Sequence, residues 1–88
     1  MPRYIIERNI GSFTEADIEA VSRRSIEVLE EMDGIVWIRS YASHSEGKVY
    51  CEYEAPSEEA VREHARRVGI PADKIAEIQL EVSPSMFV

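Results

Sequence analysis

Hydrophobic and polar positions along the chain change their period several times, and each change predicts a new secondary-structure element. Two segments carry apolar residues three or four positions apart, which is typical of amphipathic helices. The remaining apolar segments are short and rich in β-branched and aromatic residues, which is typical of strands. The predicted order is a strand over 4–8, a helix between Thr14 and Asp33, strands over 35–42 and 49–54, a helix between Ser57 and Gly69, and a strand over 74–82.

Residues that start and end helices support these boundaries. Thr14, with Asp17 three positions later, predicts a capping box in which each side chain bonds a backbone amide that has no helical partner. Ser57 is expected to cap the second helix. Gly34 and Gly69 each follow a helix, at a position where glycine easily adopts the left-handed conformation.

The order strand, helix, strand, strand, helix, strand predicts an α+β fold of the ferredoxin-like type. This fold is a βαββαβ sandwich in which a four-stranded antiparallel sheet carries two helices on one face. We expect a single domain over residues 1–88, because 88 residues is about the size of one small domain. Residues 83–88 form an apolar tail that is expected to fray or to pack on a partner subunit.

The alternation of side chains along the two central strands predicts which residues lie on the sheet face that the helices leave open, because successive strand residues point to opposite faces. The set predicted to lie under the helices is Val36, Ile38, Ser40 and Ala42 with Val49, Cys51 and Tyr53. The set predicted to lie on the open face is Trp37, Arg39, Tyr41, Tyr50, Glu52 and Glu54. Because aromatic residues and arginine are enriched at interfaces, the open face predicts a homodimer, with Arg39 paired to Glu52. The alternative is a solvated sheet face.

Charge and composition narrow the partners that the chain is expected to bind. Acidic residues outnumber Lys and Arg by 17 to 10, and the net charge is −7. Such a surface is a poor partner for nucleic acid and for anionic membranes. The longest apolar run, residues 35–38, is far too short to span a membrane. The lone Cys51 cannot form an internal disulfide, so we expect a reducing, cytoplasmic location.

His64 is the side chain that most directly suggests chemistry. It lies on the apolar stripe of the second helix, so its ring is expected to point toward the sheet, where Cys51 is also expected. An imidazole and a thiolate are ligands for nickel, zinc or copper, and they also form activated nucleophile pairs. The alternative is a histidine bonded to a backbone carbonyl beside an inert buried cysteine.

Other candidate residues point to chemistry less directly. Glu54 ends the third strand and points away from Cys51, so it joins a metal site only at the sheet edge or in a dimer. His44 lies in the hairpin loop beside Glu46, where a solvated side chain is the ordinary interpretation. The chain contains no glycine-rich phosphate loop, CxxC, HExxH or GxSxG motif.

Several segments together resemble a known family. They are Pro2-Arg3-Tyr4 with Glu7-Arg8, Val36-Trp37 with Arg39-Ser40-Tyr41, Tyr50-Cys51, residues 53–56, residues 59–65, Gly69 and Pro71. These segments are similar to a family of small bacterial proteins, long catalogued as a domain of unknown function, that includes a nickel-binding protein. The resemblance implies a ferredoxin-like fold, a homodimer and nickel binding, with His64, Cys51 and Glu54 as candidate ligands in the matching segments.

Three functions stay open on the sequence alone. The first is a cytoplasmic homodimeric protein that binds nickel or another divalent transition metal, for buffering or storage. The second is a small dimeric α/β-barrel enzyme with a His64-centred pocket for an apolar or aromatic substrate, and with Tyr53 or Cys51 as polar partner. The third is a binding or regulatory module without chemistry, which a fully buried His64 bonded to the backbone would favour.

Overall fold

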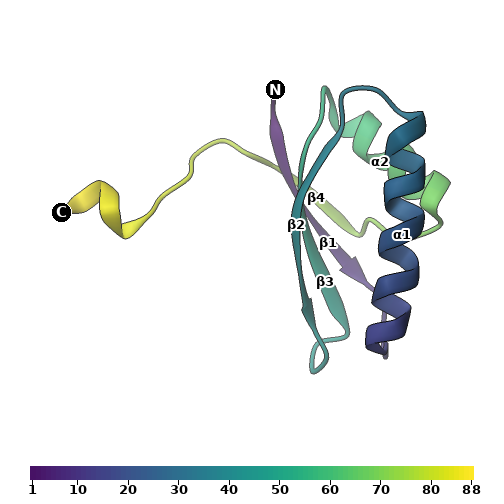
Figure 1. Cartoon of the computed structure of the whole chain (residues 1–88). Helices are drawn as coiled ribbons and strands as arrows, with labels where there is room; N and C mark the ends of the chain where they lie inside the picture. The colour runs from purple at the N-terminus through teal and green to yellow at the C-terminus, as the bar shows by residue number, and fades with distance from the viewer.

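The main elements follow the predicted order in the computed structural model, which describes residues 1–88. They are β1 (Arg3–Asn9), α1 (Glu15–Glu31), β2 (Val36–Ser43), β3 (Lys48–Glu54), α2 (Glu58–Val68) and β4 (Lys74–Ile78), and a short 3-10 helix, η1 (Pro84–Phe87), follows near the C-terminus. The strands pair antiparallel in the order β2-β3-β1-β4. Both helices lie on one side of the sheet (Figure 1), which confirms the ferredoxin-like α+β fold.

The helix boundaries follow the predicted capping residues. The Thr14 side chain accepts a hydrogen bond from the Asp17 amide, and the Asp17 carboxylate accepts one from the Thr14 amide. The Ser57 hydroxyl accepts a hydrogen bond from the Ala60 amide at 3.2 Å. Gly69 ends α2 in the left-handed conformation, with φ of 86°. Both helices therefore begin where local side-chain chemistry satisfies their first amides.

A β-bulge in β2 places two residues on the opposite face of the sheet from the one predicted, so this part of the prediction is wrong. Trp37 and Arg39 lie opposite consecutive residues of β3, so Ile38 is an extra residue in the pairing. An extra residue turns the positions before it onto the other face. Trp37 therefore lies on the helix-covered face and donates a hydrogen bond to the Ser40 hydroxyl. Val36, which was expected under the helices, takes the open face and is 48% exposed.

The open face of the sheet keeps the rest of its predicted set. These residues are Arg39, Tyr41, Tyr50, Glu52 and Glu54, and Ile5 of β1 joins them. Arg39 lies opposite Glu52 in the pairing, but the predicted ion pair between them is absent. Glu52 instead accepts a hydrogen bond from Arg3, with 2.9 Å between Nη1 and Oε2, because Arg3 extends along the same face from β1.

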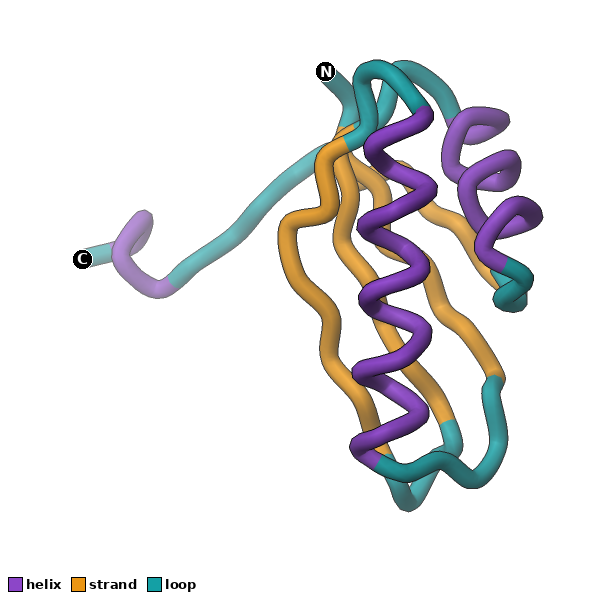
Figure 2. Tube along the Cα trace, turned by 45° about the vertical axis from the view of Figure 1, so that its right-hand side comes forward, coloured by secondary structure: helices purple, strands orange, loops and turns teal.

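Strand β4 is shorter than its alternating pattern predicts. It ends at Ile78, not at Val82, because its only partner is β1, and β1 begins at Arg3 opposite Ile78. Beyond that point no strand offers hydrogen bonds, and Leu80 is 77% exposed. The following segment leaves the sheet on the side opposite the helices and ends in η1, away from the rest of the molecule (Figures 1 and 2).

The hydrophobic core is concentrated at the end of the sandwich that α2 covers. Its buried members are Tyr4, Ile6, Ile35, Cys51, Tyr53, Ala55 and Val61. Helix α2 adds His64, Ala65 and Val68 to the buried residues, whereas the longer α1 buries only Ser25 and Val28. The inward face of α1 thus packs incompletely on the sheet and leaves a space between them.

Gly47 in the β2–β3 hairpin provides a test of the packing between this hairpin and the loop after β1. A Cβ atom at Gly47 would lie 3.1 Å from both the Cα and the carbonyl oxygen of Gly11, and Gly47 has φ of +63°. Gly69 has φ of +86° but open space around it. We expect Gly69→Ala to cost about 1–2 kcal/mol from conformational strain, and Gly47→Ala to cost about 1 kcal/mol more because backbone atoms must also move. Urea unfolding of both variants measures the difference, and equal losses would contradict it.

Candidate functional site

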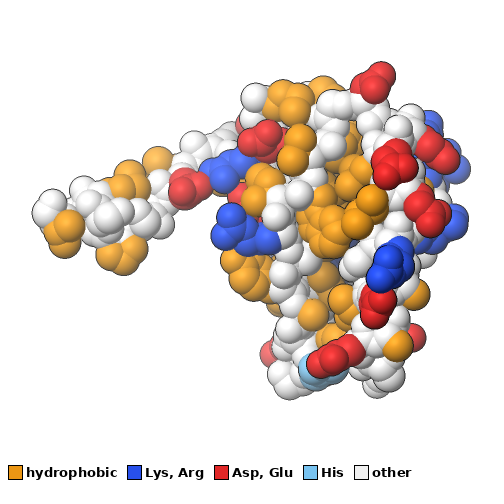
Figure 3. Space-filling model, viewed as in Figure 1, with side chains coloured by type: hydrophobic (Ala, Val, Ile, Leu, Met, Phe, Trp, Pro, Cys, Tyr) orange, Lys and Arg blue, Asp and Glu red, His pale blue; other side chains and the backbone are white.

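A cavity of about 440 Å³ lies between α1 and the helix-covered face of the sheet. Sixteen residues line the cavity, and ten of them are hydrophobic. The 16 residues come from α1, from all strands except β4, and from two loops. Figure 3 shows hydrophobic side chains gathered in the space between the sheet and α1, with charged side chains on the outer surface of the helix. The cavity is therefore a mainly apolar space that one edge of the sandwich leaves unfilled.

The cavity exists because small residues stand where the sandwich would otherwise be packed. Helix α1 presents Ser22 and Ser25 toward it, and the strands present Ser40, Ala42 and Cys51. These side chains are too short to fill the distance between a helix and a sheet, which is about 10 Å in packed structures. The inward face of α1 therefore has side chains at helical spacing, but their volume is too small to fill the space above the sheet.

Arg8 is the only basic residue in the wall of this cavity. It follows Tyr4 and Ile6 on the helix-covered face of β1 and is only 2% exposed. Its Nε atom donates to the Cys51 sulfur at 3.4 Å, and its Nη1 atom donates to the Pro71 carbonyl at 2.8 Å. Its Nη2 atom is buried and has no hydrogen-bond partner. The site therefore contains a fixed positive charge with one guanidinium nitrogen that has no acceptor.

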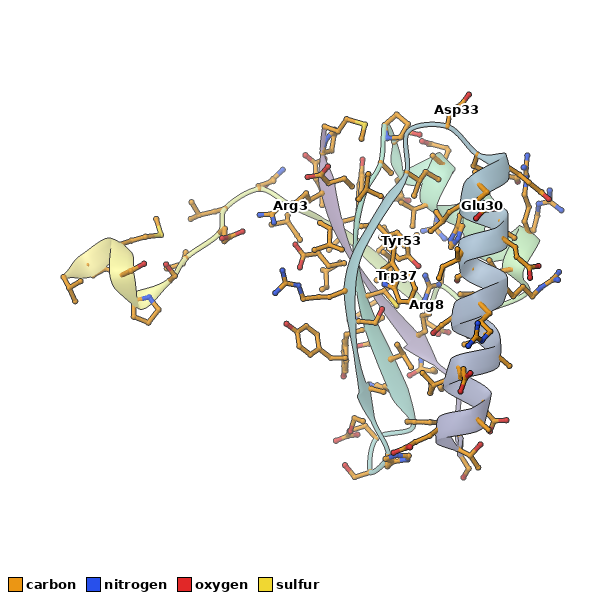
Figure 4. The ribbon with its side chains drawn as sticks, in the orientation of Figure 1. Arg3, Arg8, Glu30, Asp33, Trp37 and Tyr53 are labelled. Atoms are coloured by element: carbon orange, nitrogen blue, oxygen red, sulfur yellow. The ribbon has the colours of Figure 1, made fainter.

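Tyr53 packs between Arg8 and His64. The Arg8 guanidinium carbon lies 5.9 Å from the centre of the Tyr53 ring, and the His64 ring lies 5.4 Å from it at a tilt of 55°. Arg8, Trp37 and Tyr53 extend from the sheet into the space facing α1 (Figure 4). Burial raises the pKa of Tyr53, since the phenolate is poorly solvated there, so the phenol stays protonated at neutral pH.

His64 points inward from α2, as the sequence predicted, and is 1% exposed. Its Nε2 atom lies 3.3 Å from the Ser25 carbonyl oxygen, which can only accept, so Nε2 carries the proton. Its Nδ1 atom is buried without a partner. Burial lowers the pKa of His64, the Ser25 contact opposes this, and the charge of Arg8 lowers it further. His64 is therefore a neutral imidazole that joins α2 to α1.

The three predicted metal ligands are not brought together within one chain. His64 and Cys51 are both buried under the helices, whereas Glu54 lies on the open face of the sheet. No group of three or more His, Cys, Asp or Glu residues is placed to hold a metal ion. His44, the other histidine, is exposed and stacks on Phe13 with 4.3 Å between ring centres.

A cavity lies beside two of the residues considered for an enzyme pocket, but it is not centred on His64. Cys51 and Tyr53 line the cavity, whereas His64 does not. The polar residue that sequence analysis missed is Arg8, and the signal was the alternation of Tyr4, Ile6 and Arg8 along β1. Trp37 was also missed as a lining residue, because only the pairing of β2 reveals the bulge.

These features define a small α+β protein of the ferredoxin-like type with one apolar cavity. A family described as nickel responsive protein, SCO4226-like, matches residues 4–78. The crystal structure of SCO4226 from Streptomyces coelicolor A3(2) matches with a TM-score of 0.82 at 25% sequence identity, covering 91% of this chain and 99% of that chain. No curated protein matches the chain.

The chain therefore belongs to the SCO4226-like family of nickel-responsive proteins, which confirms the resemblance in its sequence. The match spans all four strands and both main helices, so it includes the residues around the cavity. None of the helices has the length and apolar character that crossing a membrane requires.

The environment of His64 predicts a loss of stability in mildly acidic solution. Its pKa in the folded protein is below 6.5, so below that pH the unfolded chain binds more protons than the folded one. The free energy of unfolding therefore decreases as the pH falls from about 7 to about 5.5, by at most about 1.4 kcal/mol per pH unit. Urea unfolding at several pH values measures this dependence.

Two glutamine variants separate His64 from other titrating groups. His64→Gln retains an amide donor near the Ser25 carbonyl but does not titrate, so we expect the decrease above about pH 5.5 to disappear. His44→Gln removes the exposed histidine and should leave the decrease intact. An unchanged pH dependence in His64→Gln would show that another group causes it.

Proposed function

We propose that this chain is a binding protein without catalytic activity, and that its cavity takes up one small, mainly apolar molecule. The cavity itself carries the proposal, because its volume of about 440 Å³ and its hydrophobic lining fit such a molecule. Sites for small molecules commonly have volumes of about 300–1,000 Å³ and combine an apolar wall with a few polar groups. Here those polar groups are Arg8, Cys51 and Tyr53.

The environment of His64 favours binding over catalysis. A general base must reach the proton that it removes, but His64 faces the Ser25 carbonyl and is not part of the cavity wall. The raised pKa of Tyr53 makes its phenol a poor base at neutral pH. A fully buried histidine bonded to the backbone is the arrangement expected of a module without chemistry.

Nickel binding is the second candidate function, and membership of a nickel-responsive family supports it. Within one chain the donors do not form a site of three ligands, so nickel, or another divalent transition metal, would need donors from two copies. Glu54 is the predicted ligand with the best position for this, because it lies on the open face of the sheet. Buffering or storage of the metal would follow from such a site.

A homodimer through the open face is part of this second candidate. The face presents Tyr41, which is 60% exposed, beside the aromatic Tyr50 and the apolar Val36. The tail at residues 83–88 extends away from the sheet on the side opposite the helices (Figure 1), where a second copy would cover it. Its Phe87 is 75% exposed. We place the protein in the cytoplasm, where Cys51 stays reduced.

Binding of N-phenyl-1-naphthylamine, a neutral apolar fluorophore, tests the cavity. We expect micromolar affinity and energy transfer from Trp37, the only tryptophan, because it lines the cavity. Ser22→Phe should weaken binding by roughly tenfold or more, since the new ring occupies the cavity.

Ala20→Phe is the matched control for this experiment. Ala20 lies on the same helix but is exposed and outside the cavity wall, so its affinity for the fluorophore should stay within about twofold of wild type. Circular dichroism checks that both variants are folded. If wild type does not bind, or if Ser22→Phe binds as well as wild type, the cavity is not the binding site.

Calorimetric titration with Ni²⁺, combined with sedimentation, tests the second candidate. We expect heat at micromolar Ni²⁺, and a shift toward the dimer because donors from two copies share the ion. Glu54→Gln should remove both effects, whereas Glu30→Gln, which changes an exposed carboxylate on α1, should remove neither. Absence of heat in wild type, or full binding by Glu54→Gln, would contradict a site that includes Glu54.

A further inference from the structure

The positive charge of Arg8 is buried without a negative partner. Arg8 takes part in none of the ion pairs of the chain. Its two hydrogen-bond acceptors are the Cys51 sulfur and the Pro71 carbonyl, neither of which is a carboxylate, and Nη2 has no acceptor. Burying an unpaired charge is costly in free energy, so a fully buried arginine normally has a carboxylate or phosphate beside it.

The chain has no spare group that removes this charge. Asp17 is the only acidic residue in the cavity wall, and its carboxylate already accepts a hydrogen bond from the Thr14 amide at the start of α1. The Tyr53 ring, 5.9 Å from the guanidinium, provides a cation–π contact but no net negative charge. No Asp or Glu of the chain is therefore paired with Arg8, and an anion bound from outside would fill that role.

We propose that the molecule bound in the cavity is an apolar monocarboxylate, and that its carboxylate pairs with the guanidinium of Arg8. This inference rests on the proposed binding function and names the class of ligand. Arg8 lines the cavity together with Cys51 and Tyr53, and its Nη2 atom is the guanidinium nitrogen that has no acceptor. The apolar wall fits the hydrocarbon part of the ligand, and the guanidinium fits its charged end.

A carboxylate fits this site better than a phosphate group. Only one guanidinium nitrogen lacks a partner, and no second Lys or Arg lines the cavity. A phosphate carries more charge and more acceptor oxygens, and its sites usually combine several donors. One planar oxyanion on an aliphatic or aromatic body matches one guanidinium in the wall of an apolar space.

A pair of probes that differ only in charge tests the inference. Calorimetry compares 2-naphthoate with the neutral 2-naphthamide on the wild-type protein at neutral pH. We expect naphthoate to bind at least about tenfold more tightly, because a hydrogen bond to a charged partner is stronger than one between neutral groups. Equal affinities would overturn the inference while leaving the binding function intact.

Variants at two arginines assign the preference to Arg8. Arg8→Gln should remove the preference for naphthoate and retain the affinity for naphthamide within about threefold. Arg23→Gln makes the same change of charge on the exposed face of α1, and it should leave the preference unchanged. A preference that survives in Arg8→Gln would overturn the assignment.

A measurement on the wild-type protein alone tests the inference even if Arg8→Gln does not fold. The Arg8 charge contributes to the lowered pKa of His64, so a carboxylate beside Arg8 should raise that pKa. Titration of the His64 ring by NMR should show this rise with saturating naphthoate and not with naphthamide. No rise with bound naphthoate would place its carboxylate away from Arg8. If neither probe binds, both the inference and the binding function are wrong.

Discussion

The interior of this protein depends on the contacts that the buried guanidinium of Arg8 makes. The guanidinium comes from β1, donates to Cys51 of β3 and to the carbonyl of Pro71 before β4, and packs on Tyr53. It thereby ties the two central strands to the connection that leads into the edge strand. Its charge also lowers the pKa values of Tyr53 and His64, opposing the effect of burial on Tyr53. The same side chain therefore contributes to both the packing and the electrostatics of this site.

The sandwich is packed unequally under its two helices, and this inequality leaves a cavity. Under α2, residues such as Val61 and His64 fill the space above the sheet. Under α1, the small side chains of Ser22 and Ser25 leave a cavity whose only basic side chain, Arg8, has no ion partner. The cavity and the open face of the sheet, which carries Glu54, are different surfaces of the molecule.

Much of the fold could be predicted from local patterns. The capping box at Thr14 and the left-handed Gly69 are set by neighbours within a few residues, so their sequence signals are direct. The inward direction of His64 followed from helical periodicity alone. Of the candidate site, the sequence identified Cys51 and Tyr53 on the covered face but not the residue that gives the cavity its charge.

The sequence by itself determined the order of elements, their caps and the inward stripe of α2, because these depend on dihedral preferences and periodicity within one segment. Only the tertiary structure decided the bulge that turns Trp37 inward, the end of β4 at Ile78, and the partners of Arg8. Each of these depends on which distant strand or carbonyl is available for pairing. Alternation within one strand does not contain that information.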